Sequence, residues 1–265
     1  TVEHSSGLPH LVGDPEQAPT MQHVAFGDAV GGLNGSAAIL TALWHKQRTG
    51  EGQFVDLSQV ECLFPLAAPG ILHQSVHGQT PQRFGNAHPD HAPHGVYPCH
   101  GEDAWAVIQV TEETQWHQLQ AIIPALSEFG DLDERLAKRE AIDECIGAWT
   151  QQRTASEVMQ TLQAAGVTAA KLNNGQELLD EPHLHDRGYL QWLERDHVGL
   201  QPHPSAPFRT AEEPIPITSP SPTLGQHNHA ILVDLLGLST DELQQLEQQG
   251  VIGTKPRMPS GKSAT

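Results

Sequence analysis

The sequence predicts an α/β protein, and three local patterns carry that prediction. Over residues 28–48, apolar side chains recur every three or four positions, which is typical of an amphipathic helix. A glycine turn and the β-rich run 53–58 follow, so helix, turn and strand come in the order expected of a parallel α/β unit. The apolar run 104–110 predicts a buried strand. The segment 78–103 between these regions is rich in Gly, Pro, His and Asn, and we expect a long loop joining two domains.

The helix expected over 28–48 begins at Asp28, which can cap its start, and glycines follow its end. Small residues lie on its apolar stripe and would let another backbone approach closely, although each glycine costs about 1 kcal/mol of helix propensity relative to alanine. After the strand at 53–58 we expect a second helix, broken near Pro65 and Pro69.

Helical spacing returns after the strand at 104–110. Three helices are expected over residues 112–124, 132–149 and 154–165. Thr154 and Glu157 form a capping box, and Gly166 stands where a left-handed helix end belongs, ahead of a β-prone run.

Short strands and polar loops are expected beyond Pro182. A helix over 224–236 is closed by Gly237, and Ser239 caps a last helix closed by Gly250, so that a helical hairpin ends the fold.

Composition excludes several classes of partner. Acidic residues outnumber Lys and Arg by 32 to 14, and the net charge of -18 argues against nucleic acid and against anionic membrane surfaces. The sequence contains neither a run of about 20 apolar residues nor a leader peptide at its start. Three widely spaced cysteines make a disulfide framework improbable and favour the cytoplasm.

The densest group of reactive side chains contains His88, His91 and His94, with Cys99 and His100 close behind. We expect no metal here, because prolines prevent the helix that would put these side chains on one face, and no CxxC pair supports them. Most of the 17 histidines are interpreted as solvated polar residues.

The same loop has a second interpretation. Gly85, Asn86 and His88 can bring backbone amides and side chains close to a bound carboxylate or thioester. Asp28 and Asp56 lie at the ends of expected elements, where capping explains them without catalysis. Signatures of hydrolases, P-loop proteins and zincins are absent from the sequence.

Three segments together resemble the family III coenzyme A transferases, which include formyl-CoA transferase and carnitine-related enzymes. They are GDAVGGLNGSAAILTALWHKQRTGEGQFVDLS (27–58), RFGNAHPDHAPHGVYPCHGEDAWAVI (83–108) and SPTLGQHNHAILVDLLGLSTDELQQLEQQGVI (221–252). Their order and spacing agree with the family, and the resemblance runs over residues 1–252.

The resemblance implies the C-terminal part of a Rossmann-like large domain, a small α/β domain and an interlocked homodimer when full length. It implies these boundaries: 1–77, the remainder of the large domain; 78–103, the connecting loop; 104–190, the small domain; 191–252, a returning C-terminal segment; and 253–265, a disordered tail.

The resemblance also implies the chemistry. Coenzyme A moves between carboxylic acids through an aspartyl anhydride and an enzyme thioester, the CoA thioester being a substrate and no cofactor being permanently bound. The nucleophilic aspartate of such enzymes precedes an SGL-type triplet, here Ser6-Gly7-Leu8, so we expect it upstream of Thr1 and expect the isolated chain to be inactive. Activity in this chain would instead direct attention to Glu3, Asp14 and Asp28. The loop at Gly85, Asn86 and His88 corresponds to the segment that covers the acyl group.

Two alternatives remain open. An acyl-CoA racemase of the same superfamily would move an α-proton with acid and base groups rather than use a nucleophile. A non-catalytic partner subunit or truncated product would pack in a dimer without chemistry of its own.

Overall fold

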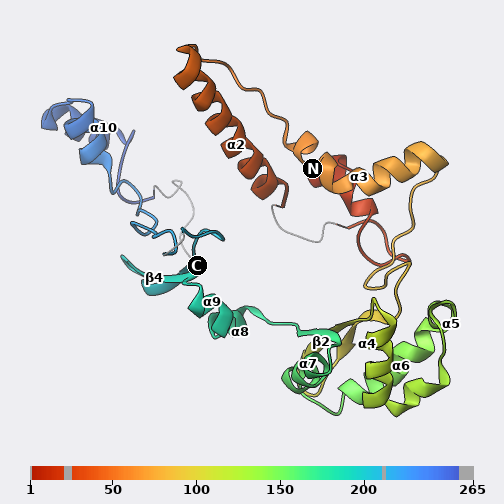
Figure 1. The fold of residues 1–265 in the computed structure, drawn as a ribbon. Helices are drawn as coiled ribbons and strands as arrows, with labels where there is room; N and C mark the ends of the chain where they lie inside the picture. The colour runs from red at the N-terminus through yellow and green to blue at the C-terminus, as the bar shows by residue number, and fades with distance from the viewer. Residues whose placement is uncertain (1, 21–25, 211–212, 257–265) are drawn as a thin grey trace, which may run out of the picture. The chain divides into compact units, whose positions relative to one another are not determined.

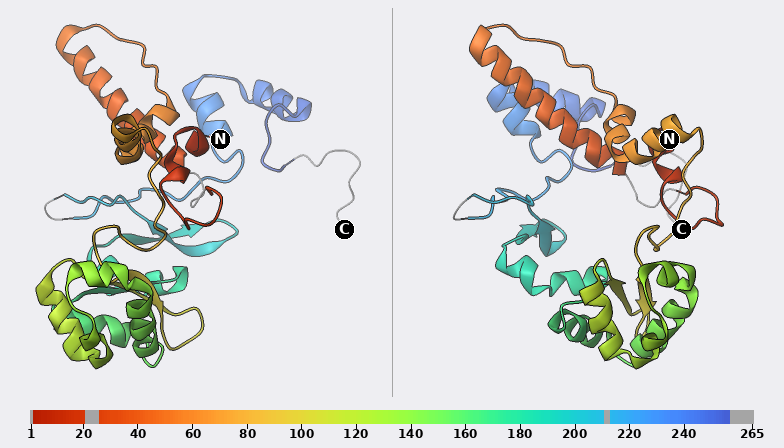
Figure 2. Two further views of the ribbon diagram at one scale, coloured as in Figure 1. Left: turned by 90° about the vertical axis from the view of Figure 1, so that its right-hand side faces the viewer. Right: turned by 45° about the vertical axis from the view of Figure 1, so that its right-hand side comes forward.

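The structure of the chain is a computed structural model that describes residues 2–20, 26–210 and 213–256. It divides into two compact units, Thr1–Leu172 and Asn173–Thr265. Figure 1 and Figure 2 show both units as ribbons, with helices and strands mixed along the chain. The α/β class predicted from the sequence is therefore confirmed.

The first unit begins with helices. Its elements are α1 (Val2–Ser5), the short 3-10 helix η1 (Leu8–His10), α2 (Phe26–Thr49) and α3 (Gln59–His77). α2 confirms the helix predicted over 28–48, but it begins at Phe26, so Asp28 lies within its first turn and is not the cap that was expected. The glycines of α2 let neighbours approach. A Cβ added at Gly31 would lie 2.8 Å from Cγ of Gln59, and one at Gly27 would lie 3.0 Å from Cγ1 of Val2.

The strand predicted over 53–58 is wrong. Residues 51–58 run between α2 and α3 without strand structure, and Phe54 within them is 92% exposed. A β-rich run becomes a strand only where a partner accepts its backbone hydrogen bonds, and no described strand pairs with this segment.

The break predicted in the second helix is also wrong, since α3 continues through Pro65 and Pro69. Leu63, Ala67 and Gly70 are buried on one face of α3. Burial of a face generally contributes more to a helix than propensity does, and here it outweighs the bonds lost at the prolines.

A three-stranded antiparallel sheet organises the rest of the first unit. Its strands are β1 (His94–Pro98), β2 (Trp105–Gln109) and β3 (Thr168–Lys171), in the order β1-β2-β3. β2 confirms the strand predicted over 104–110. β1 lies inside the segment predicted as a loop, 78–103, and pairs along its whole length with β2.

The helices of this part are α4 (Glu113–Ile122), the 3-10 helix η2 (Pro124–Glu128), α5 (Leu132–Ala137), α6 (Arg139–Thr150) and α7 (Ala155–Ala164). The single helix predicted over 132–149 is divided at Lys138, whereas the capping box at Thr154 and the left-handed Gly166 (φ 79°) are confirmed. One apolar core joins the sheet to these helices, with Ile108, Trp116 and Ile146 among its fully buried members.

The second unit is built from short elements. It contains α8 (Gly175–Leu179), α9 (Pro182–Asp186), the antiparallel pair β4 (Leu190–Arg195) and β5 (Gly199–Pro204), the π-helix η3 (Ala230–Leu235) and α10 (Thr240–Gln249). The helix predicted over 224–236 is shorter than expected, but its end at Gly237 and both ends of α10 are confirmed. The tail predicted to be disordered falls largely outside the described residues, which end at 256.

Arg135 is a buried cation between the helices and the loop before β1. Its side chain is 3% exposed and forms an ion pair of 2.7 Å with Glu113. It also donates to the carbonyl oxygens of Ala92 (3.0 Å) and Gly130 (3.3 Å), and its guanidinium lies 4.8 Å from the ring centroid of Trp116. Every polar edge of this side chain therefore meets an acceptor inside the fold.

Replacing Arg135 by Met should lower the free energy of unfolding by about 2–3 kcal/mol, because a buried carbonyl group at Ala92 and a part-buried one at Gly130 lose their donor. Lys138→Met is the matched control, since Lys138 forms an exposed pair with Glu134 and should have little effect. Urea unfolding of both variants measures the difference. Equal stabilities would show that Arg135 does not organise the fold.

Candidate functional site

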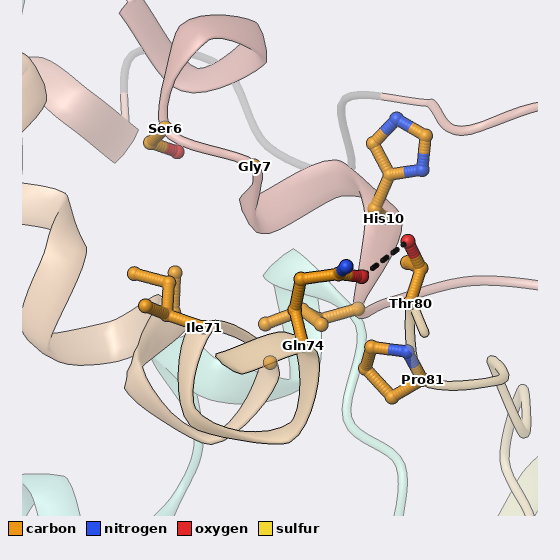
Figure 3. Close-up of a pocket in the computed structure, with 10 residues that line it drawn as sticks. Ser6, Gly7, His10, Ile71, Gln74, Thr80 and Pro81 are labelled. Atoms are coloured by element: carbon orange, nitrogen blue, oxygen red, sulfur yellow. Dashed lines mark hydrogen bonds between the residues drawn. The ribbon is translucent and has the colours of Figure 1, made fainter. Parts of the chain in front are cut away.

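A cavity of about 330 Å³ lies in the helical part of the first unit (Figure 3). The Ser6-Gly7-Leu8 triplet contributes Ser6 and Gly7 to its wall, and α3 contributes Gly70, Ile71 and Gln74. Gln74 Oε1 accepts a hydrogen bond of 3.4 Å from Thr80 on the chain that leaves α3. The cavity thus combines an apolar floor with a few polar groups, as small-molecule sites do.

The loop after α3 is anchored to the chain that follows the triplet. Arg83 donates from Nε to the carbonyl of Asp14 at 3.1 Å and from Nη2 to that of Gln17. The amide of Gly85 donates to Gly13 at 3.1 Å. Arg83 is thereby committed to backbone carbonyls, which makes it a structural anchor of the loop.

The three residues predicted for the substrate loop lie close together in sequence, at a bend. Gly85 has a φ of 58°, in the left-handed region that glycine adopts without a steric cost. The carbonyl of Asn86 accepts from Nδ1 of His94 at 2.7 Å, and the carbonyl of His88 accepts from Nη2 of Arg139 at 2.6 Å. The loop is therefore attached to β1 and to α6, and its role at a substrate stays a prediction.

The carboxylates named as fallback nucleophiles have different environments. Glu3 is buried, and its Oε1 accepts the amide of Gly27 at 2.9 Å. Asp14 accepts the amide of Glu16, as in a turn. Asp28 is exposed in the first turn of α2, and its Oδ1 accepts 3.1 Å from Nε2 of Gln59. Glu3 and Asp14 are engaged with backbone, whereas Asp28 presents a carboxylate to solvent.

The contact between Gln59 and Asp28 was not predicted from the sequence. The two residues are far apart along the chain and meet because α3 begins beside the first turn of α2 (Figure 1). The local sign of it is Gly31, whose missing side chain leaves room for that of Gln59.

The histidines of the loop gather, although no helix puts them on one face. The ring of His88 lies 4.6 Å from that of His91 and 5.5 Å from that of His94, measured between centroids. Within the described part of the chain, no three His, Cys, Asp or Glu side chains are placed to hold a metal ion.

Comparison with known proteins identifies the family. The profile of CoA-transferase family III matches residues 1–228. The chain belongs to CoA-transferase family III. A succinyl-CoA–D-citramalate CoA-transferase of Chloroflexus aurantiacus is 29% identical over 259 residues, which cover 94% of this chain and 63% of that protein. A probable CoA-transferase of Mycobacterium tuberculosis is 31% identical over 236 residues, which cover 86% of this chain and 29% of that protein.

Solved structures agree with this membership. The crystal structure of a CAIB/BAIF family protein from Brucella suis matches with a TM-score of 0.77 at 27% identity, over 88% of this chain and 61% of that one. A Mycobacterium tuberculosis structure with a TM-score of 0.67 shares the fold at 20% identity. The chain thus spans less than two thirds of the length of these relatives. The resemblance predicted from the three segments is confirmed at the level of the family, and its formyl-CoA or carnitine subtype stays a prediction.

One further observation concerns membranes. Across residues 2–20, 26–210 and 213–256, no helix has the length and apolar content to cross a bilayer.

The family III chain also has a polar cleft beside the loop. It is lined by Asn86 and His94, by β1, and by acidic side chains of α6. At its base, the buried Tyr97 donates 2.6 Å to Oδ1 of Asp143. Burial raises the pKa of Asp143, whereas the hydrogen bond from Tyr97 lowers it. Burial, together with the neighbouring Asp143, raises the pKa of Tyr97 above its ordinary value, so the phenol keeps its proton.

Replacing Tyr97 by Phe should lower stability by about 1 kcal/mol at neutral pH, because Asp143 loses its donor. A raised carboxyl pKa means that the folded state binds more protons than the unfolded state, so stability falls as pH rises through that interval. Without the hydroxyl of Tyr97, the folded variant carries a buried, charged Asp143 that lacks its donor at neutral pH. Acidification protonates this carboxyl group, so the loss of stability in Tyr97→Phe should shrink.

Thermal unfolding at neutral and acidic pH measures this effect. Asp143→Asn, which keeps an acceptor and removes the charge, is the control and should reduce the pH dependence. A loss that stays the same at both pH values would contradict the coupling.

Proposed function

We propose that the protein transfers coenzyme A between carboxylic acids through an aspartyl anhydride and an enzyme-bound thioester. Membership of CoA-transferase family III supports the transfer itself. The observation that carries the chemistry is Asp28, an exposed carboxylate in the first turn of a helix of 24 residues. The N-terminal end of a helix favours negative charge and offers amide donors to an oxyanion.

Two positions are candidates for the nucleophilic aspartate. Spacing from the Ser6-Gly7-Leu8 triplet predicts it upstream of Thr1, which would leave the isolated chain inactive. The geometry favours Asp28 instead, because Gln59 orients one carboxylate oxygen and the other accepts no hydrogen bond from the described residues. The experiment below distinguishes the two.

The reaction proceeds in four displacements at acyl carbons. The carboxylate attacks the thioester carbonyl, the C–S bond breaks, and a mixed anhydride and CoA thiolate form. The thiolate then attacks the enzyme's acyl carbon, which releases the first acid and leaves an enzyme thioester. The acceptor carboxylate attacks that thioester and expels the thiolate. The thiolate finally attacks the acceptor's acyl carbon, which gives the new thioester and regenerates the carboxylate.

These intermediates hydrolyse readily, so the active site requires protection from water. We assign that role to the loop at Gly85, Asn86 and His88. Its attachment at both ends and the left-handed Gly85 support a segment that approaches a ligand through its backbone.

The donor is proposed to be a dicarboxylic acyl-CoA such as succinyl-CoA. The named relatives support this choice, since they include a succinyl-CoA–D-citramalate and a succinate–glutarate CoA-transferase. We extend the prediction of an interlocked homodimer to the full protein, and some relatives are named as alpha and beta subunits.

Replacing Asp28 by Asn in the full-length protein should reduce CoA transfer by on the order of 10³-fold or more, because an amide cannot form the anhydride. Asp56→Asn is the matched control, since Asp56 is also an exposed carboxylate of the same unit and should leave the rate unchanged. Transfer from succinyl-CoA to a second dicarboxylic acid, followed by chromatography, gives the rate.

A covalent readout accompanies the rate. Incubation with donor thioester should attach CoA to the peptide that contains Asp28, as detected by mass spectrometry after cleavage. Full activity in Asp28→Asn, with the adduct on an upstream peptide, would sink the assignment of Asp28 and support the upstream position. No adduct and no transfer in the unaltered protein would overturn the proposed function.

The racemase alternative has its own test. A transferase should not exchange the α-proton of a chiral 2-methylacyl-CoA in deuterated water when no acceptor acid is present, because no group needs to remove that proton. Mass spectrometry of the recovered thioester measures the exchange. Deuterium at the α-carbon would favour a racemase.

A further inference from the structure

We propose that His88 is an acid-sensitive latch that holds the loop between α3 and β1 in its folded path against α6. The inference deepens the proposed function, because the latch would regulate the loop assigned to cover the site. The latch itself is tested by the titration of His88 and by the exchange of the Asp90 amide, and only its link to the site requires a measurement of activity.

Two histidines of the loop have opposite hydrogen-bond roles. His94 lies 2.7 Å from the carbonyl of Asn86, and since a carbonyl only accepts, Nδ1 of His94 must carry a proton. Nδ1 of His88 lies 3.1 Å from the backbone amide of Asp90, and since an amide only donates, this nitrogen must be unprotonated. Acid therefore leaves the bond of His94 intact and breaks that of His88.

The surroundings of His88 also oppose a positive charge. His91 and His94 lie within ring contact, and Arg139 on α6 donates 2.6 Å to the carbonyl of His88. Asp90 is the one acidic group among the charges that act on His88, and it favours protonation. Burial, followed by the neighbouring histidines, lowers the pKa of His88 below its ordinary value of 6.5, and Arg139 acts in the same direction.

The sign of the pH effect follows from linkage. A histidine with a lowered pKa in the folded state is protonated more readily when its segment is released. The latch therefore contributes its full stabilisation above about pH 6.5, the ordinary pKa of histidine. It loses that stabilisation as the pH falls through the lower pKa that His88 has in the folded loop.

The segment around His88 depends on few other bonds. On one side Arg83 and Gly85 attach the loop to residues 13–17, and on the other side β1 is paired with β2. Between them, three backbone carbonyls are held by side chains. Arg139 of α6 holds that of His88, His94 holds that of Asn86, and Arg135 of α5 holds that of Ala92. Nε of Arg139 is buried and has no hydrogen-bond partner among the described residues, so a positive charge on His88 would repel a guanidinium that is only partly satisfied. Protonation of His88 weakens this contact along with its own bond to Asp90.

Nuclear magnetic resonance of the histidine rings and of the Asp90 amide tests the latch. In the unaltered protein, His88 should titrate below the solvated histidines. As the pH is lowered, the protection of the Asp90 amide against hydrogen exchange, corrected for the intrinsic pH dependence, should fall about three- to tenfold. The midpoint of this fall should equal that of the His88 titration.

Two substitutions separate the hydrogen bond from the charge. His88→Asn keeps an acceptor, because an asparagine side chain bonds to the amide two residues on, and should protect Asp90 at every pH. His88→Ala removes the acceptor and should lose the protection already at neutral pH. His117→Asn on α4 is the matched control and should behave as the unaltered protein.

The outcomes are distinct. A His88 pKa at or above that of the solvated histidines, or an Asp90 amide that does not follow it, overturns the latch. In the full-length enzyme, a CoA-transfer rate that declines with the same midpoint, and becomes independent of that midpoint in His88→Asn, supports the link to the site. If the latch titrates as expected while transfer is absent, the proposed function fails and the latch stands.

Discussion

The contacts of Arg135 are the constraint on which the larger part of the first unit depends. One buried guanidinium binds Glu113 of α4, the carbonyl of Gly130 before α5 and the carbonyl of Ala92 before β1, and it faces the ring of Trp116. A buried cation is costly unless its donors are used, so these acceptors have to stay where they are. α4, α5 and the loop before β1 are thereby fixed to a single side chain. The loop that carries His88 ends at this fixed point, because Ala92 lies just before β1.

Local rules predicted the elements whose signals are short and self-contained. The capping box at Thr154 and the left-handed Gly250 were read correctly because neighbours in the sequence satisfy them. The strand at 53–58 and the break in α3 were wrong for the opposite reason. A strand depends on a pairing partner and a proline-containing helix on a buried face, and neither can be seen in the local sequence. β1 was missed in the same way, since its register against β2 exists only after the chain folds back.

The site was predicted in part. The family resemblance directed attention to the loop and the Ser6-Gly7-Leu8 triplet, and the structure places the triplet in a cavity wall and gathers the loop histidines. The sequence did not predict that Gln59 contacts Asp28 or that Tyr97 contacts Asp143, because both pairs join distant parts of the chain. From the sequence, Asp28 was interpreted as a helix cap. Its position in the first turn of α2 also exposes its carboxylate to solvent. The N-terminal turn of a helix stabilises negative charge whether it serves structure or chemistry.

The glycines at the start of α2 support the proposal that Asp28 is the nucleophilic carboxylate. Each costs about 1 kcal/mol of helix propensity, so their presence calls for a compensating gain. Gly27 lets Val2 and Glu3 lie against the first turn, and Glu3 accepts the Gly27 amide. Gly31 makes room for Gln59, whose amide holds Asp28. Larger side chains at either position would push away the groups that fix this turn. A departure from local helix propensity, at the point where one exposed carboxylate is held in place, supports the proposal that Asp28 has a role in the reaction as well as in the helix.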